Sequence, residues 1–294
     1  MDILLCPNCR SFLVTEKNAM ICNQCNHEYP VHDDIGILVP NANEHLKYIQ
    51  SKIDGKTKDW YVSNQIESYD KGSYRHHILK RIQFVKSIIE SHMKGNNQLE
   101  NILDLGCGDG ANLRWLSKYT PNLWATDYNL DRLEKASKLV QQLGVNVKLY
   151  LADIRCLPFA NESFDIVFFN HVIEHLDDDF LALQNIYRTL KNKGLLILGT
   201  PNEGALAWRF AYAVEPRVKK RTDHLNFYTA KSISALAQKA GFKVKQIEFM
   251  GWGLPVWSID PLIRKYKIMD DIFEFVGKKI AKNQATSLYI MLEK

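Results

Sequence analysis

The sequence predicts an α/β fold with a doubly wound, mostly parallel seven-stranded sheet, preceded by a small cysteine-rich domain. Three observations support this prediction. From residue 99 onward, short apolar segments alternate with amphipathic ones, as in strands joined by crossover helices. The last two predicted strands, in FKVKQIEFM and SLYIMLEK, are instead separated by a long segment that is no standard crossover. Four of the six cysteines occur by Cys25.

Composition limits the class of protein. A chain of 294 residues with 46% hydrophobic content can bury one substantial core and carry a small accessory module. The formal net charge of +5 is far weaker than that of a dedicated nucleic-acid binder. MDILLCPNC lacks the basic region and apolar core of a signal peptide, and no apolar run is long enough to cross a bilayer. We therefore expect a cytoplasmic protein.

Residues 1–40 are predicted to form a zinc ribbon. LLCPNC and MICNQC each run an apolar segment into a CxxC turn, giving the pattern CxxC-x12-CxxC. In a reducing compartment this pattern favours a metal over disulfides, and so small a module has too little core to fold without one. Because four thiolates leave no open position, the zinc should be structural and not catalytic. The predicted ligands are Cys6, Cys9, Cys22 and Cys25.

Residues 41–98 are predicted to form a helical linker and cap. From residue 76 to Gly95, apolar residues recur at intervals of three and four, which predicts an amphipathic helix. They are Ile78, Ile82, Val85, Ile89 and Met93.

Residues 99–294 are predicted to form the main domain. Its first five strands lie in NILDL, LWATD, VKLYLAD, DIVFFN and LLILGT. Helices are predicted near 110–118, 130–143 and 177–190. In such an open sheet, ligands bind at the carboxyl ends of the strands.

The first strand of the main domain leads into a glycine turn, ILDLGCGDG. Gly106, Gly108 and Gly110 let the backbone approach a ligand closely and leave free amides at a helix N-terminus. A dinucleotide site has the spacing GxGxxG, whereas here the third glycine comes two residues after the second. The turn therefore departs from the dinucleotide pattern.

Three carboxylates lie at the ends of three successive strands. Asp104, two residues before the first glycine, could receive a cationic amine and would repel a pyrophosphate. Asp127 lies where a carboxylate accepts both hydroxyls of a ribose, and Asp153 lies at a distance suited to an adenine edge. Each alone could equally be a helix cap or a turn residue. Together they indicate a pocket for a nucleoside with an amino-acid tail.

These motifs and the run LPFANESFDIVFFNHVIEHL resemble class I S-adenosylmethionine-dependent methyltransferases, in particular the ubiquinone-biosynthesis O-methyltransferases. The resemblance covers residues 99 to about 250 and implies a Rossmann-like fold with S-adenosylmethionine as cofactor. It implies that Asp104 and the glycine turn face the methionine moiety, Asp127 the ribose and Asp153 the adenine. It also implies that Asn170 lies on the methyl-transfer side of the cofactor.

The motif HVIEH directly follows the fourth strand of the main domain. On a helix, His171, Glu174 and His175 would share one face, directed toward the reacting atoms. Histidine exchanges a proton readily near neutral pH, so we predict that His175 is the catalytic base. Glu174 would orient His175 or bind the acceptor. Alternatively, His171 and His175 only cap or pack a short helix after the strand.

A second divalent metal is a further alternative, with His171, Glu174, His175 and His224 as ligands. The motif resembles the Glu-x-x-Glu-His motif and later histidine with which plant-type small-RNA 2′-O-methyltransferases hold magnesium. His171 stands in place of their first glutamate. A nitrogen ligand there argues against Mg²⁺ and leaves a borderline transition metal.

Two aromatic and basic insertions follow the fifth strand and precede the last strand, as EGALAWRFAYAVEPRVKKRTDHLNFYT and GWGLPVWSIDPLIRKYKIMDDIFEFVGKKIAKNQ. They could form a pocket lid, contact a membrane surface or stack on nucleic-acid bases, or simply be exposed. In the quinone methyltransferases the first region faces lipid, so the resemblance favours an amphipathic acceptor.

The sequence therefore predicts methyl transfer from S-adenosylmethionine to a hydroxyl oxygen of a small or lipid-linked molecule. LLCPNC followed by HEYPVHDDIGIL resembles the zinc-ribbon activator subunit of tRNA and release-factor methyltransferases. That likeness leaves open an RNA or protein methyltransferase whose ribbon holds a macromolecule, although nucleic acid is not favoured. A cofactor-binding module without catalysis is the other alternative.

Overall fold

The structure is a computed structural model that describes residues 3–16, 18–54, 65–95, 99–214, 224–254, 256 and 259–294. Residues 215–223, which hold the basic run of the first insertion, lie outside the described residues. Within the described part, no helix is long and apolar enough to cross a membrane.

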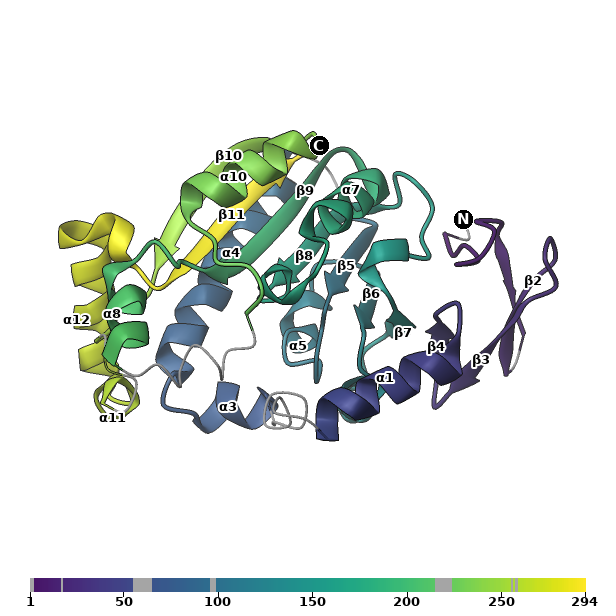
Figure 1. Cartoon of the computed structure of the whole chain (residues 1–294), viewed down its shortest axis with the longest axis horizontal. Coiled ribbons are helices and arrows are strands. Elements are labelled where there is room, and N and C mark those ends of the chain that lie inside the picture. Colours follow the sequence, from purple (N-terminus) through teal and green to yellow (C-terminus); the bar gives the residue numbers. More distant parts are fainter. Residues whose placement is uncertain are drawn as a thin grey trace.

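A single sheet runs through the molecule, with its described strands in the order β1-β2-β3-β4-β7-β6-β5-β8-β9-β11-β10 (Figure 1). Its ribbon strands are β1 Leu13–Thr15, β2 Ala19–Cys22, β3 Glu28–His32 and β4 Ile35–Leu38. The main-domain strands are β5 Asn101–Leu105, β6 Asn122–Asp127, β7 Val147–Ala152, β8 Phe164–Asn170, β9 Leu190–Pro201, β10 Lys243–Met250 and β11 Ser287–Glu293.

The seven strands of the main domain are the seven that the sequence predicts. Strands β5 to β9 pair in parallel, whereas β11 runs antiparallel to both of its neighbours, β9 and β10. This confirms a doubly wound, mostly parallel sheet. The long second insertion replaces a crossover helix between β10 and β11, which lets these two strands run in opposite directions.

The ribbon is joined to the main sheet instead of standing apart from it. Strand β4 pairs in parallel with β7, so that Ile35 lies opposite Leu149 and Leu38 opposite Ala152. All four residues of β4 are buried, which requires a neighbouring strand to satisfy their backbone groups. The sheet therefore extends beyond the seven predicted strands into the ribbon.

Helices cover both faces of the sheet. Alternate residues of a strand point to opposite faces, and here the apolar side chains on both faces are buried. Ile102 packs in the core beneath α4 and α6, whereas Leu103 packs in the core beneath α7 and α10. The helices are α1 Ala42–Asp54, α3 Gln65–Lys71, α4 Arg75–Gly95, α5 Leu113–Leu116, α6 Leu130–Leu143, α7 Asp179–Thr189, α8 Leu206–Val214, α10 Ala230–Lys239, α11 Asp260–Arg264 and α12 Lys267–Phe275.

Two predicted helices differ from the structure in length. The helix expected near 110–118 is α5, a single turn. The glycine turn precedes it, and the side chain of its N-cap residue, Asn112, makes no capping hydrogen bond. The helix expected near 177–190 is α7, whose N-terminus is fixed by the Asp178 carboxylate accepting from the Leu181 amide at 2.9 Å. The amphipathic helix predicted before Gly95 is α4.

Candidate active site

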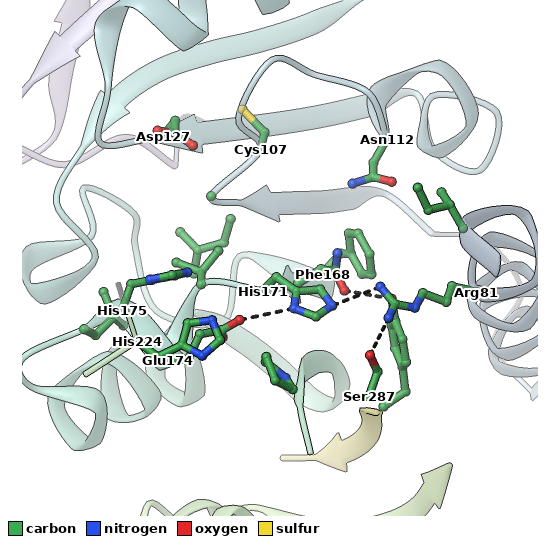
Figure 2. A pocket seen from close by; sticks show the side chains of 18 of the residues that line it. Arg81, Cys107, Asn112, Asp127, Phe168, His171, Glu174, His175, His224 and Ser287 are labelled. Carbon is green, nitrogen blue, oxygen red and sulfur yellow. Dashed lines mark hydrogen bonds and ion pairs between the residues drawn. The ribbon is translucent and has the colours of Figure 1, made fainter. Parts of the chain in front are cut away.

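A cavity of about 880 Å³ opens at the carboxyl ends of the parallel strands. Residues at the carboxyl ends of β5, β6, β7 and β8 line it, together with residues of α4 and of the two insertions. Figure 2 shows Asp127 and Cys107 above, Glu174, His175 and His224 at lower left, and Arg81 with Ser287 at lower right. This is the edge at which open α/β sheets bind their ligands.

The glycine turn brings the backbone close to its neighbours. Gly106 has a φ of 77°, and a Cβ on it would lie 2.4 Å from Cγ2 of Val172. The Gly106 amide donates to the Thr126 carbonyl at 2.8 Å, which ties the turn to β6. Gly106 lines the cavity, whereas Gly108 and Gly110 are not among its lining residues.

Asp104 is a buried carboxylate with an unused oxygen. It is 2% exposed, and its Oδ2 has no hydrogen-bond partner among the described residues. Burial, followed by the nearby charge of Asp127, raises the pKa of Asp104 to about 8. The side chain itself does not line the cavity, although its neighbours Leu105 and Gly106 do. A cation at this place would stabilise the ionised carboxylate.

The other two predicted acids line the cavity. Asp127 accepts from the Gly108 amide at 2.8 Å and from the Asn129 amide at 2.9 Å, which fixes its carboxylate, while burial raises its pKa. Asp153 forms an ion pair with Arg155, with Oδ2 and Nη2 2.6 Å apart. If Asp153 contacts the adenine, as the resemblance implies, it does so while paired with Arg155.

Asn170, the last residue of β8, also lines the cavity. Its Oδ1 accepts from the Tyr289 hydroxyl at 2.8 Å, so a residue near the end of the chain fixes its side chain. Gly199 allows this arrangement, since a Cβ there would lie 2.2 Å from the Asn170 Oδ1.

The helix expected for HVIEH is wrong. Strand β8 ends at Asn170, His171 has a φ of 54°, and only a 3-10 turn, Ile173–His175, follows. The side chains therefore do not share a helical face. His171 and Glu174 instead point toward each other, with Nδ1 and Oε1 3.2 Å apart (Figure 2).

His171 is fully engaged between a cation and an anion. Its Nε2 lies 3.2 Å from Nη1 of Arg81, which can only donate, so we assign the ring proton to Nδ1, facing Glu174. Burial lowers the pKa of His171, which favours this neutral form. Burial alone would raise the pKa of Glu174, but the hydrogen bond from His171 and the charges nearby outweigh it and lower that pKa.

Glu174, His175 and His224 form a potential metal-binding group. One ligand atom from each lies within 4.8 Å of the others, and Glu174 is 1% exposed. Nδ1 of His224 lies 3.2 Å from Oε1 of Glu203, an outer carboxylate of the kind that orients metal-bound histidines. Three of the four predicted ligands of a second metal thus come together, and His171 is not part of the group.

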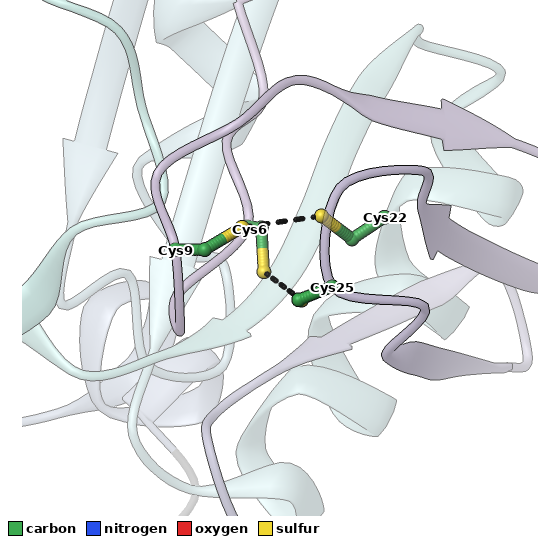
Figure 3. Close-up of side chains that lie close together, drawn as sticks. All are labelled: Cys6, Cys9, Cys22 and Cys25. Carbon is green, nitrogen blue, oxygen red and sulfur yellow. Dashed lines mark hydrogen bonds between the residues drawn. The ribbon is translucent and has the colours of Figure 1, made fainter.

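The four ribbon cysteines converge as predicted (Figure 3). Their sulfur atoms all lie within 4.8 Å of one another, with Cys9 and Cys22 3.3 Å apart and Cys6 and Cys25 3.6 Å apart. Four sulfur ligands brought together by two CxxC turns fit a tetrahedral zinc site.

Sequence reasoning missed the cavity residues that lie far from the motifs. Arg81 comes from α4, which the sequence placed in a cap, and Ser287 and Tyr289 come from the last strand. One signal was present: Arg81 stands between Ile78 and Ile82 beside the apolar face of a periodic helix. Glu203 gave no comparable signal.

Comparisons with known proteins agree with this geometry. The family model described as methyltransferase domain matches residues 103–198, and the one described as Trm112p-like protein matches residues 1–34. The ubiquinone biosynthesis O-methyltransferase of Rickettsia felis is 26% identical over 208 residues, covering 68% of this chain and 82% of that protein.

Solved structures share the fold. A SAM-dependent methyltransferase of Thermotoga maritima superposes with a TM-score of 0.54 at 19% identity, covering 84% of this chain and 99% of its own. The YcgJ protein of Bacillus subtilis gives a TM-score of 0.50 at 16% identity, over 70% of this chain and 97% of its own. The family models thus match a methyltransferase domain within the main domain and a Trm112p-like segment within the ribbon. With the Rickettsia felis relative, the glycine turn and the four clustered cysteines, they support an S-adenosylmethionine-dependent methyltransferase that carries an N-terminal zinc ribbon.

Proposed function

We propose that the enzyme methylates a hydroxyl oxygen of a small or lipid-linked acceptor and that His175 is the base. One observation carries the proposal: a single cavity is lined both by the Asp127 and Asp153 edge and by His175. Cofactor and acceptor could therefore meet in one enclosed space, where orientation alone supplies on the order of 7–11 kcal/mol.

The residues of the strand ends fit the cofactor. When bound, S-adenosylmethionine supplies an activated methyl group on a sulfonium. Asp104 would hold its ammonium group, because its Oδ2 has no partner among the described residues. A cation there would stabilise the ionised form against the burial that raises its pKa. Asp127 would accept from the ribose, and Asp153 would face the adenine. Gly106, Gly108 and Gly110 would shape the turn around the methionine moiety, and Asn170 would flank the methyl-transfer side.

His175 would take the proton of the acceptor hydroxyl at a ring nitrogen. It lies at the end of the 3-10 turn and lines the cavity, next to the buried Glu174 carboxylate. A base in this role raises the rate by roughly 10²- to 10⁴-fold. Glu174 is a positioning residue here, because His171 and Thr200 already occupy its oxygens.

The Glu174–His175–His224 group supports a second candidate for the same site. Two imidazoles and one carboxylate suit a borderline transition metal such as zinc more than magnesium. Glu174, His175 and His224 would hold such a metal, which would supply Lewis-acid chemistry for the acceptor hydroxyl, and His175 would then be a ligand instead of a base. The Glu203 carboxylate behind His224 is the observation that favours this alternative.

A lipid-linked acceptor is supported by exposed apolar side chains on the two insertions. In α8, Leu206, Phe210 and Val214 are exposed, and in α12, Ile268 and Phe275 are exposed. Figure 1 shows α8, α11 and α12 together at one end of the sheet. Contact of this end with a membrane surface is part of the proposal, as is a reducing, cytoplasmic compartment suited to the thiolate site.

The relative from Rickettsia felis bears a name in ubiquinone biosynthesis, which agrees with an amphipathic hydroxylated acceptor. The Trm112p-like match instead favours a protein or nucleic-acid acceptor. An acceptor screen separates the two. We expect release of S-adenosylhomocysteine with catechols and polyprenylated phenols, and none with tRNA or peptides. Turnover with the macromolecules alone would replace the proposal.

The role of His175 is tested with His175→Ala, using His32→Ala, an exposed histidine of the ribbon, as the control. We expect His175→Ala to lower kcat by about 10²- to 10⁴-fold while the calorimetric affinity for S-adenosylmethionine is unchanged. Full activity of His175→Ala on a hydroxyl acceptor would exclude the base.

Metal analysis of the same proteins separates the base from the metal. The base predicts one zinc per chain, bound by the ribbon, in every variant. The metal alternative predicts a second equivalent that is lost in both His175→Ala and His224→Ala.

A further inference from the structure

Arg81 is a cation of the cavity for which the described residues provide no carboxylate partner. Its side chain reaches from α4 toward the start of β11. One terminal nitrogen donates to the Ser287 hydroxyl, and the other lies against His171 (Figure 2). Its Nε is buried and has no hydrogen-bond partner, and no acidic residue in the described part of the chain forms an ion pair with it. The nearest anion in this chain of contacts is Glu174, beyond the neutral His171 ring.

The neighbouring cations differ in this respect. Lys80 pairs with Asp270 at 2.6 Å and with Asp271 at 2.8 Å. Arg264 pairs with Asp260 at 3.1 Å and with Asp270 at 2.8 Å. Lys80 and Arg264 thus form ion pairs with acidic residues of α11 and α12, whereas no described acidic residue forms an ion pair with Arg81. Arg81 is partly buried and its Nε is fully buried. Because a partly desolvated charge without a counter-charge is costly, we expect a ligand to supply one.

The surroundings of Arg81 suit a polar ligand. His77 lies one turn earlier on α4, is 4% exposed and lines the cavity. Neither of its ring nitrogens has a hydrogen-bond partner among the residues that the structure describes. Burial keeps its pKa well below the ordinary value, so the ring is neutral and offers one N–H donor without a second charge. Tyr69 and Tyr289 also line the cavity, and the charge of Arg81 acts on both hydroxyls.

We propose that Arg81, assisted by His77, binds a carboxylate of the methyl acceptor. The acceptor would then carry a carboxylate, which binds Arg81, and a hydroxyl, which lies beside His175. The inference rests on the proposed function, because it assumes that this part of the cavity receives the acceptor. One unpaired positive charge matches a monoanion, whereas a phosphate dianion would need a second cation that Lys80 and Arg264 do not leave available.

The test compares binding of three probes to the protein loaded with S-adenosylhomocysteine. The probes are 3,4-dihydroxybenzoate, its methyl ester and the corresponding phosphonate, measured by calorimetry. We expect the carboxylate to bind at least tenfold more tightly than the ester and the phosphonate. Arg81→Gln should remove the preference for the carboxylate and leave ester binding within about threefold. Arg81→Lys should restore part of it, and Arg75→Gln, an exposed arginine of the same helix, should change nothing.

The outcomes are separable from those of the proposed function. Equal binding of acid and ester by the wild type, or a preference that survives Arg81→Gln, overturns the inference. Tighter binding of the phosphonate replaces the carboxylate by a phosphate ligand. Arg81-dependent binding of the acid without any methyl transfer leaves the anion site intact and counts against the hydroxyl acceptor instead.

Discussion

At the scale of single residues, the buried Asp104 carboxyl makes the stability of the fold depend on pH. The folded protein holds its proton far more tightly than the unfolded chain, because the pKa rises from 3.8 to about 8. The unfolded state therefore loses this proton first, and the free energy of unfolding of the cofactor-free protein falls as the pH rises from about 4 to about 8. A bound cation would reverse this effect by favouring the carboxylate.

Asp104→Asn removes the titration while keeping the shape of the side chain. We expect the free energy of unfolding at pH 8 without cofactor to rise by roughly 1–4 kcal/mol, with no difference near pH 4. The same change should weaken S-adenosylmethionine binding at least tenfold. Denaturant titrations across this pH range and calorimetry check both results. A variant that binds the cofactor as well as the wild type would remove Asp104 from the ammonium site.

The residues at this scale show what one sequence can and cannot predict. Asp127 and Asn170 end strands and Asp153 directly follows one, and all three line the cavity. The sequence could point to them because strand ends can be recognised from apolar runs. Arg81 and His77 line the cavity because α4 lies next to the start of β11. This contact joins segments far apart in the sequence, so no local sequence pattern predicts it. Their roles and those of the acids stay predictions.

At the scale of elements, the connection after β8 decides the geometry of the site. The spacing of HVIEH fits a helix, but the left-handed conformation of His171 turns its ring toward Arg81 and Glu174. A local spacing rule could not predict this, because the conformation depends on the Glu174 and Gly199 contacts of His171. The strands, by contrast, follow from buried apolar runs and match the prediction.

Val172 in this connection packs against the glycine turn, which gives a test with a matched control. Gly106→Ala must place a Cβ 2.4 Å from Val172, whereas Gly144→Ala meets nothing within 4 Å, and both glycines have positive φ. We expect Gly144→Ala to lower the free energy of unfolding by roughly 1 kcal/mol. Gly106→Ala should cost about 1–3 kcal/mol more and also weaken cofactor binding. If Gly106→Ala and Gly144→Ala changed the free energy of unfolding and the cofactor affinity equally, Val172 would not pack tightly against the glycine turn.

At the scale of the whole molecule, the ribbon supports the segment that carries Asp153. Strand β4 flanks β7, the strand directly before Asp153, and Arg10 donates to the Leu157 carbonyl at 2.6 Å on the other side of that residue. The Leu5 amide also donates to the Pro158 carbonyl at 2.9 Å. Loss of the ribbon fold would thus release both ends of this segment.

Removing zinc should therefore affect the distant cofactor site. We expect chelation, or Cys22→Ser, to lower the Tm of the whole chain in one transition, with no separate ribbon transition, because the sheet is continuous. S-adenosylmethionine affinity should fall together with it, and returning zinc to the chelated wild type should restore both. Scanning calorimetry with cofactor titrations measures this. Unchanged affinity in zinc-free protein would show that the ribbon and the cofactor site are independent.

The pairing of β4 with β7 has a further consequence, because both strands belong to one polypeptide. Each main domain is therefore synthesised together with one ribbon, and their association does not depend on protein concentration. The specific activity of the enzyme should therefore stay the same on dilution to any concentration at which the chain remains folded.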